Sequence, residues 1–248
     1  MHKLLHRENV MPDLLTESLQ LWQQRDTFAA IEHLLRHDDA LAAADAFIAL
    51  MRECYWKRKD LPAAILFGRA GGQHAFAAAA SIEPGHAERA KALRHKGKGF
   101  FYDIGSFTWR GWDEAGITIT PSDEAIGRDA ARTNLRLAQE LDRGDLPLSR
   151  ARWLAGAHAL AAGELDAARQ HFVAAAEFAD KAASRSDALL NHGYMHMRDL
   201  LKDPTDASAL KQLQDVKADL RTVEYGDEFV AQLETALRVF SSPSPEPR

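Results

Sequence analysis

Apolar residues between Trp153 and Phe178 recur mainly at steps of three and four, the spacing of residues along one face of an α-helix. Two such stripes lie on either side of Gly163. Glycine adopts a positive φ without a Cβ clash, and it is common just past the end of a helix. The pattern therefore predicts two antiparallel helices with Gly163 in the turn between them.

Small residues on both stripes indicate that these two helices pack closely. Gly156 falls on the buried stripe of the first helix, where a missing side chain lets the partner approach. Close packing can offset the roughly 1 kcal/mol that glycine costs in a helix. In the second helix Ala168 and Ala175 are the small residues, and Phe172 fills the space between them. The stretch thus predicts a tightly packed helical hairpin.

Similar spacing appears earlier in the chain. Asp13–Gln24 and Thr27–Arg36 are expected to form a first pair of helices. The next hairpin has Lys59-Asp60 at its turn, and Pro62 is tolerable in the first turn of its second helix, where backbone amides lack partners. The residues at positions equivalent to those of the hairpin around Gly163 are Met51, Tyr55, Ala64, Gly68 and Gly71.

The middle of the chain predicts another helix of the same kind. It begins at an N-cap signal, Thr120-Pro121-Ser122-Asp123, with an acid in the first turn. Its second-helix pattern consists of Ala131, Leu135 and Ala138. Its partner helix would span roughly Gly85–Phe107, with an unusually long connection between the two.

The rest of the chain extends the series. Asp187–Lys202 and Thr205–Val223 are expected to form a hairpin joined through Asp203-Pro204, and Asp227–Phe240 would cap the array. The only β-prone run, Ile117–Thr120, is too short to found a sheet. The chain is therefore predicted to hold about eleven helices and no strand, arranged as an all-α solenoid of helical hairpins.

One hairpin resembles a tetratricopeptide repeat (TPR). That family has a glycine in its first helix, a glycine at the turn, and then alanine, a bulky residue and alanine in the second helix. The residues that stand at these spacings are Gly156, Gly163, Ala168, Phe172 and Ala175. Trp153 is one place out of register, and Ala155 replaces the usual leucine.

The resemblance implies an all-α fold, a right-handed α–α superhelix (a TPR-like solenoid) of about five helical hairpins with a capping helix. It implies a single TPR-like repeat domain over residues 1–240. Residues 241–248 are Ser/Pro-rich and are expected to be a disordered tail. Because repeat folds serve many tasks, the resemblance bears on the fold more than on the function.

In TPR proteins the concave groove is lined mostly by the first helix of each hairpin. Carried over by position, this implies the groove residues Glu53, Trp56, Arg150, Trp153 and Tyr194. For Trp56 and Trp153 core packing is the alternative, since tryptophan is large enough to be buried and partly exposed at once. The positions where chaperone-tail binders hold a terminal carboxylate carry Ala46, Ala49 and Ala157, which disfavours a cochaperone role.

The segment Ser106–Thr120 interrupts the regular helical spacing of apolar residues. It contains two of the five tryptophans, Trp109 and Trp112. Helix connections usually have about two to eight residues, and longer ones are often functional or disordered. One interpretation is a binding loop across the concave face, with the tryptophans as anchors and Arg110 contacting an acidic or aromatic group. The other is an ordered loop that fills a gap between irregular repeats.

Charge and cysteine content narrow the function classes. The formal net charge is −5 with well-mixed charges, which argues against binding to nucleic acid or to an anionic membrane. The single cysteine, Cys54, excludes a disulfide within the chain, indicates a reducing compartment and is interpreted as a small core residue. No apolar run approaches the ~18 residues that a membrane span needs. The first residues do not show the pattern of a signal peptide. We expect a cytoplasmic protein.

Little in the sequence predicts catalysis. The histidine pairs at a spacing of four are His2/His6, His33/His37 and His192/His196. Two histidines on one helix face are a weak site, because zinc needs a third and usually a fourth ligand. There is no phosphate-cradling glycine loop and no GxSxG nucleophile turn. We therefore assign no catalytic residue, no cofactor and no metal.

The leading hypothesis is a non-catalytic scaffold that binds a protein or peptide segment in the concave groove of a TPR-like array. The alternative is a small-molecule-binding protein or enzyme with a pocket beneath the 106–120 loop, and with His33, His37 or Arg110 in polar roles. A third interpretation is a homo-oligomer that self-associates through its alanine-rich faces.

Overall fold

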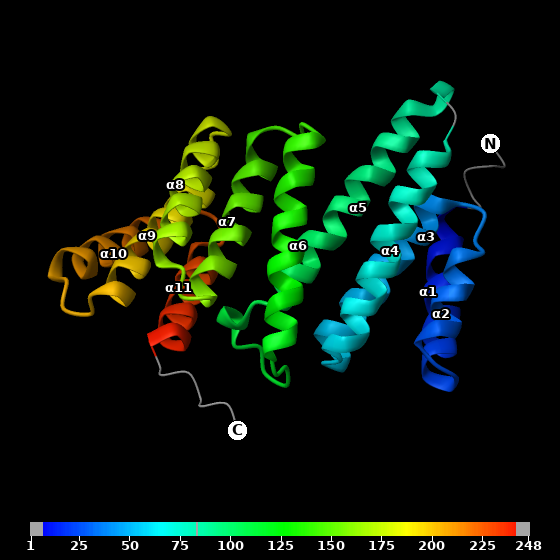
Figure 1. Cartoon of the computed structure of the whole chain (residues 1–248), viewed down its shortest axis with the longest axis horizontal. Coiled ribbons are helices and arrows are strands. Elements are labelled where there is room, and N and C mark those ends of the chain that lie inside the picture. Colours follow the sequence, from blue (N-terminus) through cyan, green and yellow to red (C-terminus); the bar gives the residue numbers. More distant parts are fainter. Residues whose placement is uncertain (1–6, 83, 242–248) are drawn as a thin grey trace. The chain divides into compact units, whose positions relative to one another are not determined.

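The computed structural model describes residues 7–82 and 84–241, and these ranges form eleven α-helices and no strand (Figure 1). The prediction of an all-α chain is confirmed. The helices are α1 (Arg7–Gln24), α2 (Thr27–Leu35), α3 (Ala40–Glu53), α4 (Leu61–Ser81), α5 (Ala87–Phe107), α6 (Pro121–Glu140), α7 (Asp145–Ala161), α8 (Leu165–Lys181), α9 (Arg185–Lys202), α10 (Ala207–Leu220) and α11 (Gly226–Ser241). Three short pieces accompany them, the π-helix η1 (Cys54–Arg58) and the 3-10 turns η2 (Pro84–His86) and η3 (Arg110–Trp112).

The chain divides into two compact units, unit 1 up to Phe107 and unit 2 from Thr108 onward. Unit 1 contains α1–α5, and unit 2 contains α6–α11. Within each unit helices that follow one another pack together, α3 on α4 and α4 on α5 in unit 1, and α6 through α10 in sequence in unit 2. The expected disordered tail, 241–248, lies outside the described residues apart from Ser241.

The helix near 85–107 and the helix after Thr120, which the sequence predicts as partners, each pack against a helix of their own unit. The first of these helices, α5, packs against α4 in unit 1, and the second, α6, packs against α7 in unit 2. The glycines of α4 explain the α5 contact, because a Cβ on Gly68 would lie 2.9 Å from the Ile104 side chain of α5. A helix with a glycine at that place accepts its neighbour closely.

The hairpin of α7 and α8 is built as its spacing predicts. Gly163 has a φ of 73°, its amide donates to the Leu160 carbonyl at 3.0 Å, and the Glu164 amide donates to the Ala159 carbonyl at 2.9 Å. This pair of hydrogen bonds is a Schellman motif, which satisfies the last carbonyls of α7. Gly156 lies against Phe172, whose Cε1 atom would be 2.7 Å from an added Cβ.

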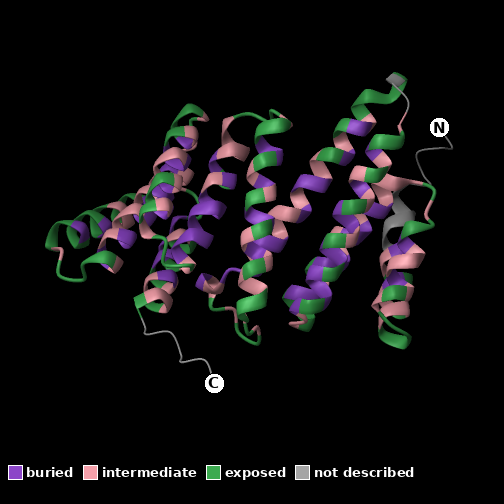
Figure 2. Cartoon of the chain, viewed as in Figure 1, coloured by how far each residue is buried: buried purple, intermediate pink, exposed green. Residues whose placement is uncertain are grey.

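Helix starts also follow local sequence signals. Thr120 caps α6 through a capping box with Asp123, and Pro121 occupies the first turn. Pro62 stands in the first turn of α4, after the Asp60 cap. The buried residues lie along the contacts between packed helices, and α7 is buried on nearly all sides from Ala151 to Leu160 (Figure 2).

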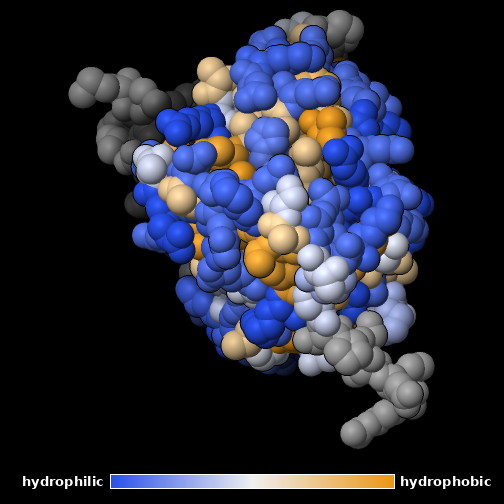
Figure 3. Space-filling model, turned by 90° about the vertical axis from the view of Figure 1, so that its left-hand side faces the viewer, coloured by the Kyte–Doolittle hydropathy of each residue, from blue (hydrophilic) through white to orange (hydrophobic). Residues whose placement is uncertain are grey.

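One helix of unit 2 is largely uncovered. α10 buries Ala209, Leu213 and Leu220, and most of its other side chains are exposed. On the face shown in Figure 3, hydrophilic residues dominate and hydrophobic residues form small separate areas. Scattered surface apolar residues of this kind are normal and do not by themselves indicate an interface.

Candidate functional site

The interior of unit 2 contains a group of five aromatic side chains, Trp109, Trp112, Trp153, Tyr194 and Phe240, which we call the aromatic cluster. Trp109 lies at its centre and is only 1% exposed. Its ring centroid lies between 5.1 and 6.1 Å from those of the other four, in edge-on or tilted contacts. Its Nε1 donates a hydrogen bond to the Ala157 carbonyl at 2.9 Å. The connecting segment is thereby bound to α7, α9 and α11.

Polar contacts fix the same segment. The Arg110 guanidinium donates to the Ala161 carbonyl at 3.0 Å, pairs with Glu124 at 3.2 Å, and lies 4.9 Å above the Phe240 ring. Asp113 pairs with Arg238 at 2.8 Å. Gly111 lies directly against the Trp109 ring, so closely that a Cβ at this position would overlap it. Through these contacts the four residues Arg110–Asp113 bind to α6, α7 and α11.

Four of the residues that the sequence marked for binding are therefore in contact with one another. Trp153 is 6% exposed, with Trp109 and Trp112 packed on it, and Tyr194 is fully buried, with Trp109 packed on it. Tyr194 also accepts a hydrogen bond from Gln232 at 2.7 Å. Trp109 and Tyr194 are not available to a partner at the surface of this structure. The segment that contains Trp109 and Trp112 packs on the aromatic side chains of α7 and α9. Trp112 and Arg110 are partly exposed at its edge.

Arg150 is exposed at the surface of unit 2 and forms an ion pair with Asp187 of α9 at 3.1 Å. In unit 1 Glu53 is largely shielded, and it pairs with Lys57 at 2.9 Å and with Arg58 at 3.7 Å. Both charged side chains that the sequence marked for the groove are thus held by ion pairs within the chain.

Trp56 differs from the other marked aromatics because 53% of it is exposed. It lies in η1, where its ring makes edge contacts with Tyr55 at 4.7 Å and Phe107 at 5.9 Å. The Lys59 ammonium lies 5.9 Å from its ring centroid. One edge of the indole is therefore supported by the core of unit 1 while the remainder is open to solvent.

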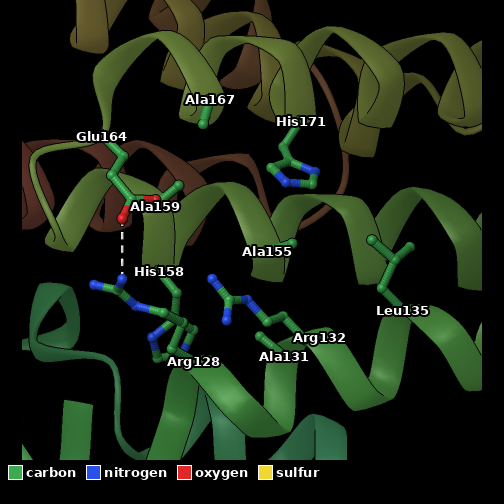
Figure 4. A pocket seen from close by; sticks show the side chains of 10 residues that line it. All are labelled: Arg128, Ala131, Arg132, Leu135, Ala155, His158, Ala159, Glu164, Ala167 and His171. Carbon is green, nitrogen blue, oxygen red and sulfur yellow. Dashed lines mark hydrogen bonds and ion pairs between the residues drawn. The ribbon is translucent and has the colours of Figure 1, made fainter. Parts of the chain in front are cut away.

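A second feature of unit 2, which the sequence analysis missed, is a pocket of about 90 Å³ lined by α6, α7 and α8 (Figure 4). Its lining is small or apolar at five positions and ionisable at the other five; we call it the cationic pocket. Its lining residues are Arg128, Ala131, Arg132, Leu135, Ala155, His158, Ala159, Glu164, Ala167 and His171. None of them belongs to 106–120. The sequence signal that could have found it is the arginine pair at a spacing of four, Arg128 and Arg132, followed by Leu135 on the same helix face.

Positive charge dominates this pocket. Arg128 pairs with Glu164 at 3.0 Å, and Glu164 is the only acidic residue in the lining. Arg132 has no ion-pair partner among the described residues. Burial and the nearby charge of Arg152 lower the pKa of His171, whose Nδ1 is buried and has no hydrogen-bond partner in the part of the chain that the structure describes.

Among the described residues, the histidines outside the cationic pocket do not form a site with more potential ligands. His33 lies 3.2 Å from Glu17, and His37 contacts the Asp39 backbone. Burial lowers the pKa of His196, with His192 and Arg169 adding to the effect and Asp199 opposing it. Within residues 7–82 and 84–241 no group of three or more His, Cys, Asp or Glu side chains could hold a metal ion. The His2/His6 pair lies outside the described residues.

Cys54 is fully buried in unit 1. Burial raises the pKa of its thiol to about 12, with Asp60 and Glu53 adding to the effect. Since the thiolate is the reactive form, this cysteine is a core residue, as predicted.

Comparison of the sequence with protein-family models and with curated proteins finds no match. No helix in the described ranges combines the length and the apolar character that crossing a bilayer requires.

Proposed function

We propose that the protein is a non-catalytic scaffold of the cytoplasm that binds a protein or peptide segment. The observation that carries this proposal is the exposure of Trp56, a residue that the sequence marked for binding and that the fold leaves uncovered. Tryptophan is the residue type most enriched among those that dominate binding energy at interfaces. Its indole is rigid and needs little ordering when a partner binds.

The surroundings of Trp56 suit such a role. Its edge contacts with Tyr55 and Phe107 hold the ring in one orientation, so that a partner would meet a preorganised surface. Lys57 and Lys59 are its neighbours in the chain, and Lys57 is paired with Glu53. Charged residues around an aromatic centre are the usual arrangement of a polar rim around an interface core.

The TPR-like architecture, a right-handed superhelix of hairpins, is part of the same proposal. It is supported by the order of packing in unit 2, where α7, α8, α9 and α10 each pack on the next. It is supported also by the small-residue contact of Gly156 with Phe172. Helical repeats of this kind present extended binding surfaces.

The alternative, a pocket beneath the 106–120 loop, is less favoured because the aromatic cluster fills the space under that segment with the chain's own side chains. The cationic pocket lies elsewhere, on α6–α8. Its lining includes no serine, threonine, cysteine or lysine, and its one carboxylate, that of Glu164, is paired with Arg128. A binding role therefore fits this pocket better than covalent catalysis.

Affinity capture with the full chain tests the proposal. Wild type, Trp56→Ala and the matched control Phe28→Ala are compared for the proteins that they retain from the source cell. Phe28 is also an aromatic of unit 1 and is 71% exposed. We expect Trp56→Ala to reduce retention of a specific partner about tenfold or more, the effect of losing a binding hot spot.

The control should retain that partner at the wild-type level, and circular dichroism should show an unchanged helix content in both variants. Equal retention by wild type and Trp56→Ala would remove the support for this surface.

A further inference from the structure

The cationic pocket combines an open volume with positive charge that its own lining neutralises only in part, since it holds two arginines and one acid. Figure 4 shows Arg132 reaching into the pocket from α6 and His171 reaching in from α8, with Ala155 of α7 between them. We propose that this pocket binds a carboxylate group, with Arg132 as its principal charge partner. The inference concerns unit 2 and is independent of the proposal for Trp56.

The charges that line the pocket favour an anion. One arginine and one acid cancel, because Arg128 is paired with Glu164. Arg132 remains without an acidic partner among the described residues, and two histidines, His158 and His171, face the same space. An arginine that lines a pocket and lacks an internal partner keeps the full hydrogen-bonding capacity of its planar fork.

Buried nitrogen atoms next to this space lack partners as well. The Nδ1 atom of His171 and the Nε atom of Arg152 are both buried without a hydrogen-bond partner in the described part of the chain. Burial lowers the pKa of His171, and the nearby charge of Arg152 adds to this effect. Unpartnered buried polar groups are costly. A carboxylate in the pocket would offer acceptors to these two nitrogen atoms.

The shape of the pocket selects among anions. Its floor is made of alanines, among them Ala155, Ala159 and Ala131, and Leu135 closes one side. A carboxylate can bind the guanidinium fork through both oxygens while its methylene chain lies on this apolar floor. Inorganic phosphate has no such chain to lie against the alanines. The chemistry therefore favours a carboxylate on a short aliphatic chain.

A group of this kind could come from a free dicarboxylic acid or from a glutamate side chain of a peptide. Calorimetric titration of the full chain with glutarate, with a capped pentaglutamate peptide and with inorganic phosphate distinguishes these sources. Three proteins are compared, wild type, Arg132→Gln and Arg136→Gln. Arg136 is the matched control, since it lies one turn further along α6, is exposed like Arg132, and pairs with Glu140 rather than lining the pocket.

We expect glutarate or the peptide to bind wild type in the millimolar range or tighter, and Arg132→Gln to weaken this binding about tenfold or more. Arg136→Gln should change it less than about twofold, because Arg136 does not line the pocket and its charge is already paired with Glu140. Binding of glutarate alone assigns the site to a free acid, and tighter binding of the peptide assigns it to an acidic segment.

A second measurement does not depend on any variant folding. In wild type the imidazole NMR signals of His171 should shift on addition of glutarate, while those of the exposed His86 should not. The proposal is overturned if no probe binds at millimolar concentration, if both arginine variants lose the same affinity, or if phosphate binds more tightly than either carboxylate.

Discussion

Gly156 shows how one missing side chain determines a helix contact. The Phe172 ring occupies the space that a Cβ would need, and both residues are buried between α7 and α8. We expect Gly156→Leu to destabilise the protein by about 1–3 kcal/mol, because extra carbons in a filled contact force side chains and backbone to move. Chemical denaturation followed by circular dichroism measures this loss.

Gly99→Ala is the control for that change, since Gly99 is also within a helix but has open space around its Cα. It should leave stability unchanged or raise it by up to about 1 kcal/mol, because alanine is the better helix former. An unaltered denaturation midpoint for Gly156→Leu would contradict the close packing of α7 and α8.

Three partly buried histidines predict a pH dependence of stability. Burial lowers the pKa values of His74, His171 and His196, so the folded state holds these rings neutral. As the pH falls through about 6.5, the unfolded chain binds protons before the folded protein does, and stability falls. We expect the melting temperature to drop between about pH 7.5 and about pH 5.

The loss should begin below the ordinary histidine pKa and level off once the folded-state rings are protonated as well. His171→Gln should make the dependence shallower, whereas His86→Gln, at an exposed position, should not change it. A melting temperature that rises on acidification over this range would refute the assignment of neutral buried rings.

At the scale of elements, the connecting segment from Thr108 to Thr120 is a structural part of unit 2. Trp109 packs on residues from α7, α9 and α11, which follow it in the chain. We expect Trp109→Ala to cost about 3–5 kcal/mol, the usual effect of removing a large aromatic from a core. Urea denaturation of the full chain measures this cost.

Trp56→Ala is the comparison for Trp109→Ala, because it removes the same side chain from a half-exposed position. Its cost should be clearly smaller, because a ring that is half exposed loses less buried surface. If both variants unfolded at the same urea concentration, the aromatic cluster would not be a core.

At the scale of the whole molecule, the division of the chain at Thr108 predicts that a substitution that destabilises one unit leaves the stability of the other unit unchanged. Each unit has its own buried residues, and Gly156 belongs to unit 2. Hydrogen exchange of Gly156→Leu, followed by mass spectrometry, should show faster exchange in peptides from α6–α11 than in wild type. Peptides from α1–α5 should exchange at wild-type rates. Faster exchange throughout the chain would show that the two units unfold together.

Helix positions were predictable from the sequence because the signals that set them are local. The capping box of Thr120 and Asp123 and the positive φ of Gly163 involve residues a few positions apart. The partner of α5 was not predictable in the same way. The packing of α5 on α4 depends on surfaces brought together by folding, among them the glycines of α4 that lie against α5.

The candidate sites show the same difference between what local sequence predicts and what only the folded structure decides. The sequence marked Trp56 and Trp153 equally, yet one is half exposed and the other is buried. Periodicity tells which residues share a face of a helix but not what covers that face. The cationic pocket draws its residues from three helices, so its charge appears only when Arg132 and His171 are brought together.

The sequence by itself determined that this protein is helical, where most of its helices begin and end, and that α7 and α8 form a close hairpin. These properties depend on residues near one another in the chain, where spacing and capping act directly. Only the tertiary structure decided that Trp109 fills the face of α7 and α9, that Trp56 remains open, and that a cationic pocket exists. Burial and local charge depend on which segments that are distant in the chain come into contact. The pattern of residues along the sequence does not determine those contacts.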